Sequence, residues 1–115
     1  MADRPSDLVQ GTLDMLILKT LGLESMHGFG LMLRIEQVSG GVFRPNPGSL
    51  LPALRRLERS GWLRSEWRTT DNNRRAKYYV LTDRGRRHLE EETREWKRQS
   101  AGIARILEAL PGETR

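Results

Sequence analysis

Residues 46–77 change from a helical to an alternating pattern of side chains at Gly61, and this change restricts the fold more than any other feature of the chain. Ser49 is the predicted N-cap of a helix that ends at Gly61. Pro52 would lie in its first turn, where proline is tolerated. One face of this helix carries Leu50, Leu54 and Leu57, and the opposite face carries Pro52, Arg55, Arg56 and Arg59. One side can therefore be buried while the other presents guanidinium groups.

Beyond Gly61 the pattern predicts a β-hairpin. Leu63, Ser65 and Trp67 alternate with Arg64, Glu66 and Arg68, which indicates a strand. Ala76, Tyr78 and Val80 alternate with Arg75, Lys77 and Tyr79, which indicates a second strand. Residues 69–73 between them are rich in turn-forming residues, so the hairpin should have a cationic tip.

Three further helices complete the predicted order. A nearly all-apolar helix should run from Thr12 to Gly22, a second from Gly28 to Ser39, and a long one from the N-cap Thr82 towards Pro111. This order predicts a mostly α fold with a small β-hairpin (α+β), a winged helix-turn-helix with a long C-terminal helix. We expect a flexible N-terminal arm at 1–10, a DNA-binding domain at 11–82, a dimerisation helix at 83–110 and a tail at 111–115.

The long helix predicts a homodimer. Apolar or small residues recur along it at alternating spacings of four and three: Leu89, Thr93, Trp96, Ser100, Ile103, Leu107 and Leu110. Such a helix is about 42 Å long, more than a domain of this size is wide, so it cannot bury the stripe on its own protomer. With 115 residues and 37% hydrophobic content the core is also small. We expect an interface formed by Leu13, Leu16, Leu89, Trp96, Ile103 and Leu107.

The positive charge is concentrated in one segment. The net charge is +5, but residues 44–87 alone carry 12 basic and 4 acidic side chains. A field confined to the helix and hairpin suits a polyanion such as double-stranded DNA. We expect these residues to contact DNA: Ser49, Arg55, Arg56, Arg59, Arg68, Asn72, Asn73, Arg74, Arg75 and Lys77. The simpler alternative is a solvated helix face whose arginines pair with Glu58 or with acids of the hairpin.

Two hypotheses compete for the role of Trp96. If the dimer axis passes close to it, paired indoles could sandwich a planar aromatic effector, which makes Trp96 a candidate ligand-binding residue. Ordinary packing against the first helix is the competing reading. Trp62 and Trp67, on the hairpin, are assigned to packing.

Catalysis finds no support in the sequence. The chain has no cysteine, and His27 and His88 lie far apart without metal-ligand spacing, so we expect neither an enzyme nor a metal or other cofactor. His27 is expected to bond locally in a turn. The polar N-terminus and the lack of a long apolar run predict neither a signal peptide nor a membrane partner, and the cytoplasm is the default location.

Several motifs together resemble the PadR-like transcriptional regulators. They are Gly11-Thr12-Leu13-Asp14, His27-Gly28-Phe29-Gly30, Gly48-Ser49-Leu50, Pro52-Ala53-Leu54, Asn73 to Tyr79, and Leu81-Thr82 with Gly85. The resemblance implies a dimeric winged-helix repressor with a single C-terminal helix, and some relatives of this form are thought to bind planar drugs. The chain departs from the family at Leu51 and Phe29, where members usually or often carry Tyr. The main alternative is a winged-helix module that binds another protein instead of DNA.

Overall fold

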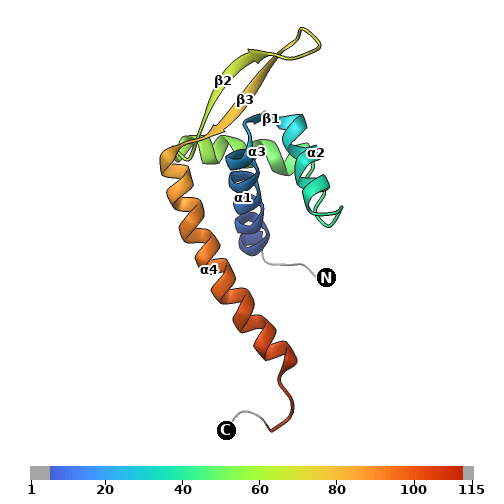
Figure 1. Ribbon diagram of the computed structural model, residues 1–115, viewed down its shortest axis with the longest axis vertical. Helices are drawn as coiled ribbons and strands as arrows, with labels where there is room; N and C mark the ends of the chain where they lie inside the picture. The colour runs from blue at the N-terminus through green and yellow to red at the C-terminus, as the bar shows by residue number, and fades with distance from the viewer. Residues whose placement is uncertain (1–5, 113–115) are drawn as a thin grey trace.

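The computed structural model of this chain describes residues 6–112. Its elements are α1 (Ser6–Leu23), β1 (Met26–His27), α2 (Gly28–Val38), α3 (Pro47–Arg59), β2 (Leu63–Thr69), β3 (Arg75–Leu81) and α4 (Asp83–Glu108). Figure 1 shows α1, α2 and α3 gathered beneath the hairpin of β2 and β3, with α4 extending far beyond them. The predicted fold class, mostly helical with a small antiparallel sheet, is confirmed.

The sheet contains one strand that the sequence did not predict. Its order is β1-β3-β2, and all neighbours are antiparallel. Leu63 pairs with Leu81 at the base of the hairpin, and Thr69 pairs with Arg75 near its tip. The two residues of β1 lie in a segment that we expected to be a plain connection. They become a strand only because Met26 pairs with Tyr79 of β3, a partner far along the chain.

The core lies where α1, α2 and α3 meet the base of the sheet. Leu18 of α1, Leu31 of α2, Leu54 of α3 and Leu63 of β2 are completely or almost completely buried. Burying a side chain of this size stabilises the fold by about 1.5–3 kcal/mol relative to leaving it exposed. The core therefore fixes the position of α3 and the hairpin relative to α1.

The boundaries of α1 and α3 correct two expectations. The first helix begins at Ser6, so residues 6–10 are helical and do not form an arm, while residues 1–5 and 113–115 lie outside the described part. The N-cap of α3 is Asn46, whose side-chain oxygen accepts a hydrogen bond from the backbone N–H of Ser49 at 3.0 Å. Ser49 therefore belongs to the first turn, and Pro52 lies one turn farther into the helix than expected.

The start of α4 is tightly docked on the hairpin. Thr82 is its N-cap, as predicted, because its hydroxyl accepts a hydrogen bond from the backbone N–H of Gly85 at 3.0 Å. The same hydroxyl donates to the carbonyl of Gly61 at 2.7 Å. From there α4 leaves the domain, and the chain measures 63 × 30 × 22 Å along its principal axes. Within residues 6–112, no helix is both long and apolar enough to cross a membrane.

Candidate nucleic-acid interface

The outer face of α3 presents two arginines to solvent. Arg55 and Arg59 lie on the side of the helix opposite the buried Leu50, Leu54 and Leu57. In the described part of the chain, neither guanidinium has an ion-pair partner. The exposed Ser49 lies in the first turn of α3. These residues form a cationic face that is free to meet an external anion.

Arg56 does not belong to that face, which corrects the sequence-based assignment. Its guanidinium donates to the carboxylate of Asp14 in α1 at 2.5 Å, and only 31% of the Arg56 side chain is exposed. Burial raises the pKa of Asp14 above its ordinary value, although the hydrogen bond and the charge of Arg56 act to lower it. The pair joins α3 to α1 across 42 positions of sequence, a distance over which no helical pattern could reveal it.

The tip of the hairpin is polar, exposed and tightly turned. The backbone N–H of Asn73 donates to the carbonyl of Thr70 at 2.9 Å, and Asn73 has a φ of 61°, in the left-handed region that Asn tolerates better than most residues. Asn72, Asn73, Arg74 and Arg75 are all exposed. The structure thus brings the four predicted tip residues together at the end of the wing, as we call the hairpin of β2 and β3.

Two other predicted DNA contacts are engaged within the protomer. Arg68 donates to Glu66 at 2.6 Å and to the hydroxyl of Ser25 at 3.1 Å. Hydrogen bonds from Arg64 and Arg68 lower the pKa of Glu66. Lys77 lies 3.5 Å from the carboxylate of Glu58 in α3. Arg68 and Lys77 therefore hold the wing against the domain, and within residues 6–112 the predicted contacts of the wing that form no ion pair are those at its tip.

The two hairpin tryptophans differ. Trp62 stacks on His88 of α4, with ring centroids 3.6 Å apart, and packs against the core as expected. Trp67 was also assigned to packing, and this was wrong, because 60% of its surface is exposed. Alternation places positions 62 and 67 on opposite faces of a strand, but it does not tell which side chain is covered. His27, by contrast, bonds locally as predicted: its Nδ1 accepts from the backbone N–H of Gly30 at 3.1 Å.

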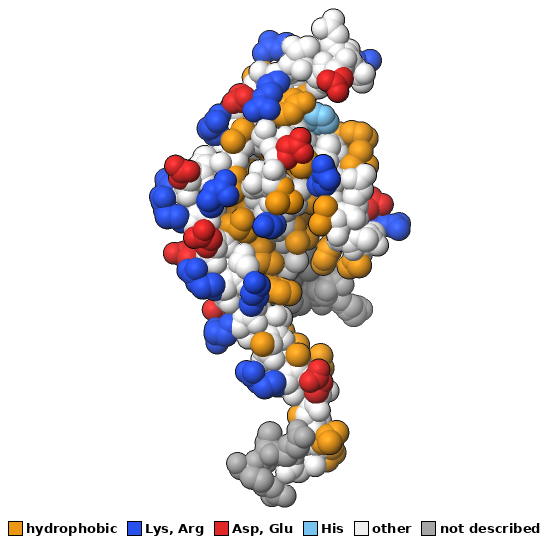
Figure 2. All heavy atoms as spheres, viewed as in Figure 1, with side chains coloured by type: hydrophobic (Ala, Val, Ile, Leu, Met, Phe, Trp, Pro, Cys, Tyr) orange, Lys and Arg blue, Asp and Glu red, His pale blue; other side chains and the backbone are white. Residues whose placement is uncertain are grey.

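A second surface runs along α4 and α1. Figure 2 shows apolar side chains gathered where α4 crosses the domain and again along the end of α4 that extends beyond it. Leu89 is buried, but Trp96, Ile103 and Leu107 are 48%, 57% and 78% exposed. Ile106, which we did not include in the stripe, is exposed as well. Leu13 and Leu16 of α1 are half-buried.

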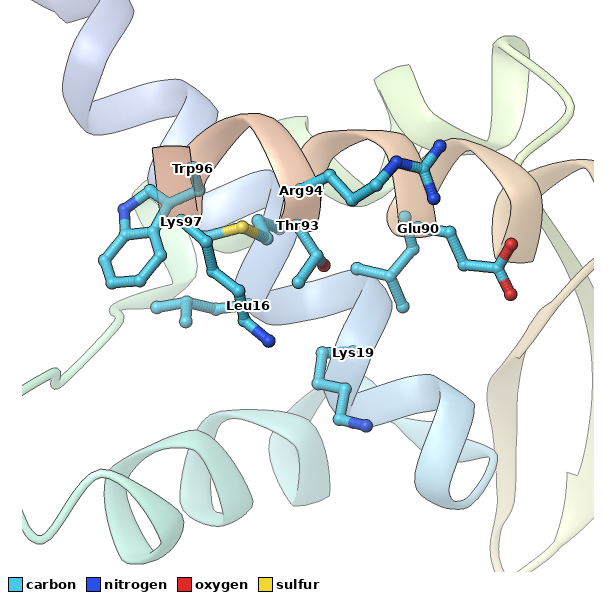
Figure 3. A pocket seen from close by; sticks show the side chains of 9 residues that line it. Leu16, Lys19, Glu90, Thr93, Arg94, Trp96 and Lys97 are labelled. Atoms are coloured by element: carbon cyan, nitrogen blue, oxygen red, sulfur yellow. The ribbon is translucent and has the colours of Figure 1, made fainter. Parts of the chain in front are cut away.

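Between α1 and α4 lies an open hollow of about 610 Å³. Its lining includes Leu16 and Lys19 of α1 and Thr93, Trp96 and Lys97 of α4. Figure 3 shows the indole of Trp96 beside Leu16 at one end, and Lys97 extending from α4 towards α1. Trp96 therefore borders this hollow next to the predicted seam.

A winged helix-turn-helix with a cationic outer face on α3 and a cationic wing defines a DNA-binding protein of the transcription-regulator class. The comparison with protein families makes this specific. Residues 17–91 match the family described as "Transcriptional regulator PadR-like family". The chain belongs to the PadR-like family of transcriptional regulators.

Three individual proteins illustrate what this chain is similar to. The chain is 34% identical to a PadR family transcriptional regulator from Eggerthella lenta, with a TM-score of 0.74 and coverage of 90% of this chain and 88% of that one. A transcriptional regulator from Clostridium thermocellum shares the fold at a TM-score of 0.80 and 22% identity, over 89% and 99% of the two chains. A 37.1 kDa protein in transposon TN4556 of Streptomyces fradiae is 38% identical over 100 residues, and the chain spans 26% of it.

Proposed function

We propose that this regulator is a homodimeric repressor that recognises a two-fold symmetric operator. The observation that carries the proposal is that Arg55 and Arg59, on the outer face of α3, have no ion-pair partner within residues 6–112 and lie next to a wing whose tip is also cationic. Arginine at such a position can donate two hydrogen bonds to the O6 and N7 atoms of guanine in the major groove. Ser49 stands at the N-terminal end of the same helix, where the helix can meet the DNA.

The wing supplies the second set of contacts in this proposal. Asn72, Asn73, Arg74 and Arg75 are grouped at its end, where they can meet phosphates or the adjoining minor groove. Arg56, Arg68 and Lys77 are satisfied by Asp14, Glu66 and Glu58, so their part is to hold α3 and the wing in position.

The exposed stripe of α4 supports the dimer. α4 is about 39 Å long at 1.5 Å per residue, and Trp96, Ile103 and Leu107 remain open to solvent on one protomer. A two-fold axis along this helix would cover the stripe with its own copy and would place two α3 helices on one side of the dimer. Spacing near 34–36 Å would fit successive major grooves. Light scattering should return twice the 13.3 kDa of one chain.

A DNA-binding experiment tests the main proposal. Sequences selected from a random duplex pool should contain an inverted repeat, and binding should survive near-physiological salt. A dimer bound between promoter elements should then block transcription by RNA polymerase in a purified system. Retention only at very low salt, with no preferred sequence, would support the module that binds another protein.

We further propose that a planar aromatic molecule relieves repression by binding beside Trp96. The open, largely apolar hollow between α1 and α4 supports this, because it lies on the helices that would meet in the dimer. A planar dye should quench tryptophan fluorescence in the wild type and in Trp67→Phe, but not in Trp96→Ala. Equal quenching in all three proteins would contradict an effector site at Trp96.

A further inference from the structure

Trp67 is a large aromatic side chain in the middle of a wing strand, yet most of it faces solvent. It lies on β2 opposite Lys77 of β3 and is 60% exposed. Leaving this much apolar area in water forgoes stabilisation that burial would bring, at about 25 cal/mol per Å². In the described part of the chain, its ring contact is with Arg75, whose guanidinium carbon lies 5.5 Å from the ring centroid.

The two faces of the wing differ in how their cationic side chains are held. On one face, Arg64 and Arg68 both donate to Glu66, at 2.8 and 2.6 Å. Arg68 also lies over the ring of Tyr78, 4.8 Å from its centroid, and bonds to Ser25 of the domain. Both arginines of this face are therefore held by Glu66, and Arg68 is also held by Ser25, so their N–H groups are already engaged within the protomer.

The opposite face turns towards α3. Ser65 donates to the carboxylate of Glu58 in α3 at 2.6 Å, and Lys77 lies 3.5 Å from the same carboxylate. Because side chains alternate along a strand, Trp67 shares the face of Ser65, and Arg75 shares the face of Lys77. Trp67 and Arg75 thus continue, towards the tip, the side of the wing that lies beside the proposed recognition helix.

We propose that Trp67 and Arg75 act together as the contact between the wing and the sugar–phosphate backbone of DNA. This inference rests on the proposed DNA binding and specifies the wing's part in it. The ring attracts the guanidinium to its face, which leaves the N–H groups at the edge of the guanidinium free to donate to a phosphate. The indole then packs against the deoxyribose beside that phosphate, and DNA covers the apolar surface that the protomer leaves exposed.

Fluorescence quenching tests the contact with Trp67 in place. In a Trp96→Phe background, Trp67 is the exposed indole and Trp62 is stacked on His88. Acrylamide, a neutral quencher, should reach Trp67 in the free protein and should be excluded when the protein binds a duplex selected from a random pool. The Trp67→Phe, Trp96→Phe double variant should lose the part of the tryptophan fluorescence that duplex binding protects from acrylamide.

Binding affinities provide the second test. Trp67→Ala should lower the affinity for the duplex about tenfold, which corresponds to about 1.4 kcal/mol of binding free energy. Trp67→Phe should retain most of the affinity because an aromatic ring remains. Arg75→Ala should weaken binding. It should also make the slope of the logarithm of the binding constant against the logarithm of salt concentration shallower by about one, because one phosphate contact is lost. Arg64→Ala is the matched control on the opposite face, where Glu66 holds the guanidinium, and it should bind as the wild type does. Circular dichroism melting curves establish that each variant is folded.

The outcomes distinguish a failure of the role proposed for Trp67 from a failure of the proposed DNA binding. If the wild type binds the duplex but Trp67 stays open to acrylamide and Trp67→Ala binds equally well, the assignment of Trp67 is overturned while DNA binding stands. If the wild type binds no duplex at all, both proposals are overturned.

Discussion

The guanidinium of Arg56 lies 2.5 Å from the carboxylate of Asp14, so the proposed recognition helix is tied to the first helix by a partly buried ion pair. Arg55, its neighbour in sequence, projects into solvent. A turn of about 100° per residue separates the two side chains and gives them different tasks. Arg56 holds α3 in place, whereas Arg55 is available to a ligand.

This difference predicts opposite outcomes for two adjacent substitutions. Arg55→Ala should leave the free energy of unfolding within about 0.5 kcal/mol of the wild type, because surface substitutions rarely do more. It should weaken DNA binding and reduce the salt slope if Arg55 meets a phosphate, or relax base preference at one position, at a cost of about 1–3 kcal/mol, if it meets guanine.

Arg56→Ala is the counterpart. It leaves the carboxylate of Asp14, whose side chain is only 23% exposed, without its hydrogen bond to Arg56, so urea unfolding should show a loss of about 1–2 kcal/mol in the free energy of unfolding. At temperatures where the variant stays folded, its salt slope should equal that of the wild type. A reduced slope with unchanged stability would place Arg56 on the DNA and contradict this assignment.

The raised pKa of Asp14 predicts a particular pH dependence. The native state holds the proton of this carboxyl more tightly than the unfolded chain, whose value is near 3.8, so this group's contribution to stability is present at low pH and is lost as pH rises through the native pKa. Between pH values just below 3.8 and neutrality, the stability of the wild type minus that of Asp14→Asn should therefore fall. Chemical denaturation at a series of pH values measures it.

Glu66 provides a control of opposite sign. Its native pKa is lowered by Arg64 and Arg68, so the stability it contributes is present above the ordinary value of 4.5 and is lost as pH falls. The difference between the wild type and Glu66→Gln should rise with pH, while that for Asp14→Asn falls. Parallel trends in the two comparisons would argue against the environment assigned to Asp14.

Local patterns predicted much of this fold because they depend on neighbouring residues. The apolar stripe of α3, the alternation of the wing strands and the N-cap at Thr82 all arise within one element. The exact start of α3 was missed because Asn46 and Ser49 are both good caps three residues apart, and the side chain of Asn46 takes the N–H of Ser49. Only the structure shows which of the two residues caps the helix.

Features set by distant partners were not predictable from such patterns. β1 exists because Met26 meets Tyr79, and the direction of Arg56 depends on Asp14 in another helix. The exposure of Trp67 depends on where α3 lies, because Glu58 of α3 contacts Ser65 and Lys77 on the same face of the wing while Trp67 stays 60% exposed. The alternation of side chains in a strand predicts two faces, but it does not predict which elements pack against each face.

Gly85 predicts a strong local constraint at the start of α4. A Cβ at this position would lie 2.9 Å from the carbonyl carbon of Trp62 and closer still to its oxygen, and the backbone cannot easily give way. Gly85→Ala should lower the free energy of unfolding by about 3 kcal/mol, the upper end of the range for overpacked substitutions. Gly102→Ala, on the same helix with nothing within 4 Å, should instead gain about 0.5–1 kcal/mol. Similar denaturation midpoints for the two variants would refute the tight docking of α4 on the wing.

The stripe of α4 predicts where an added charge would separate the proposed dimer. Leu107 is 78% exposed in the protomer, so Leu107→Lys should cost the protomer little, but in the dimer it would bury two ammonium groups against apolar side chains. Light scattering at micromolar concentration should return mostly monomer. Ala101 is also exposed on α4 and lies on the side away from the stripe, so Ala101→Lys should remain a dimer. A Leu107→Lys protein that stays dimeric would mean that the copies meet through another surface, and the proposed spacing of the two α3 helices would fail with it.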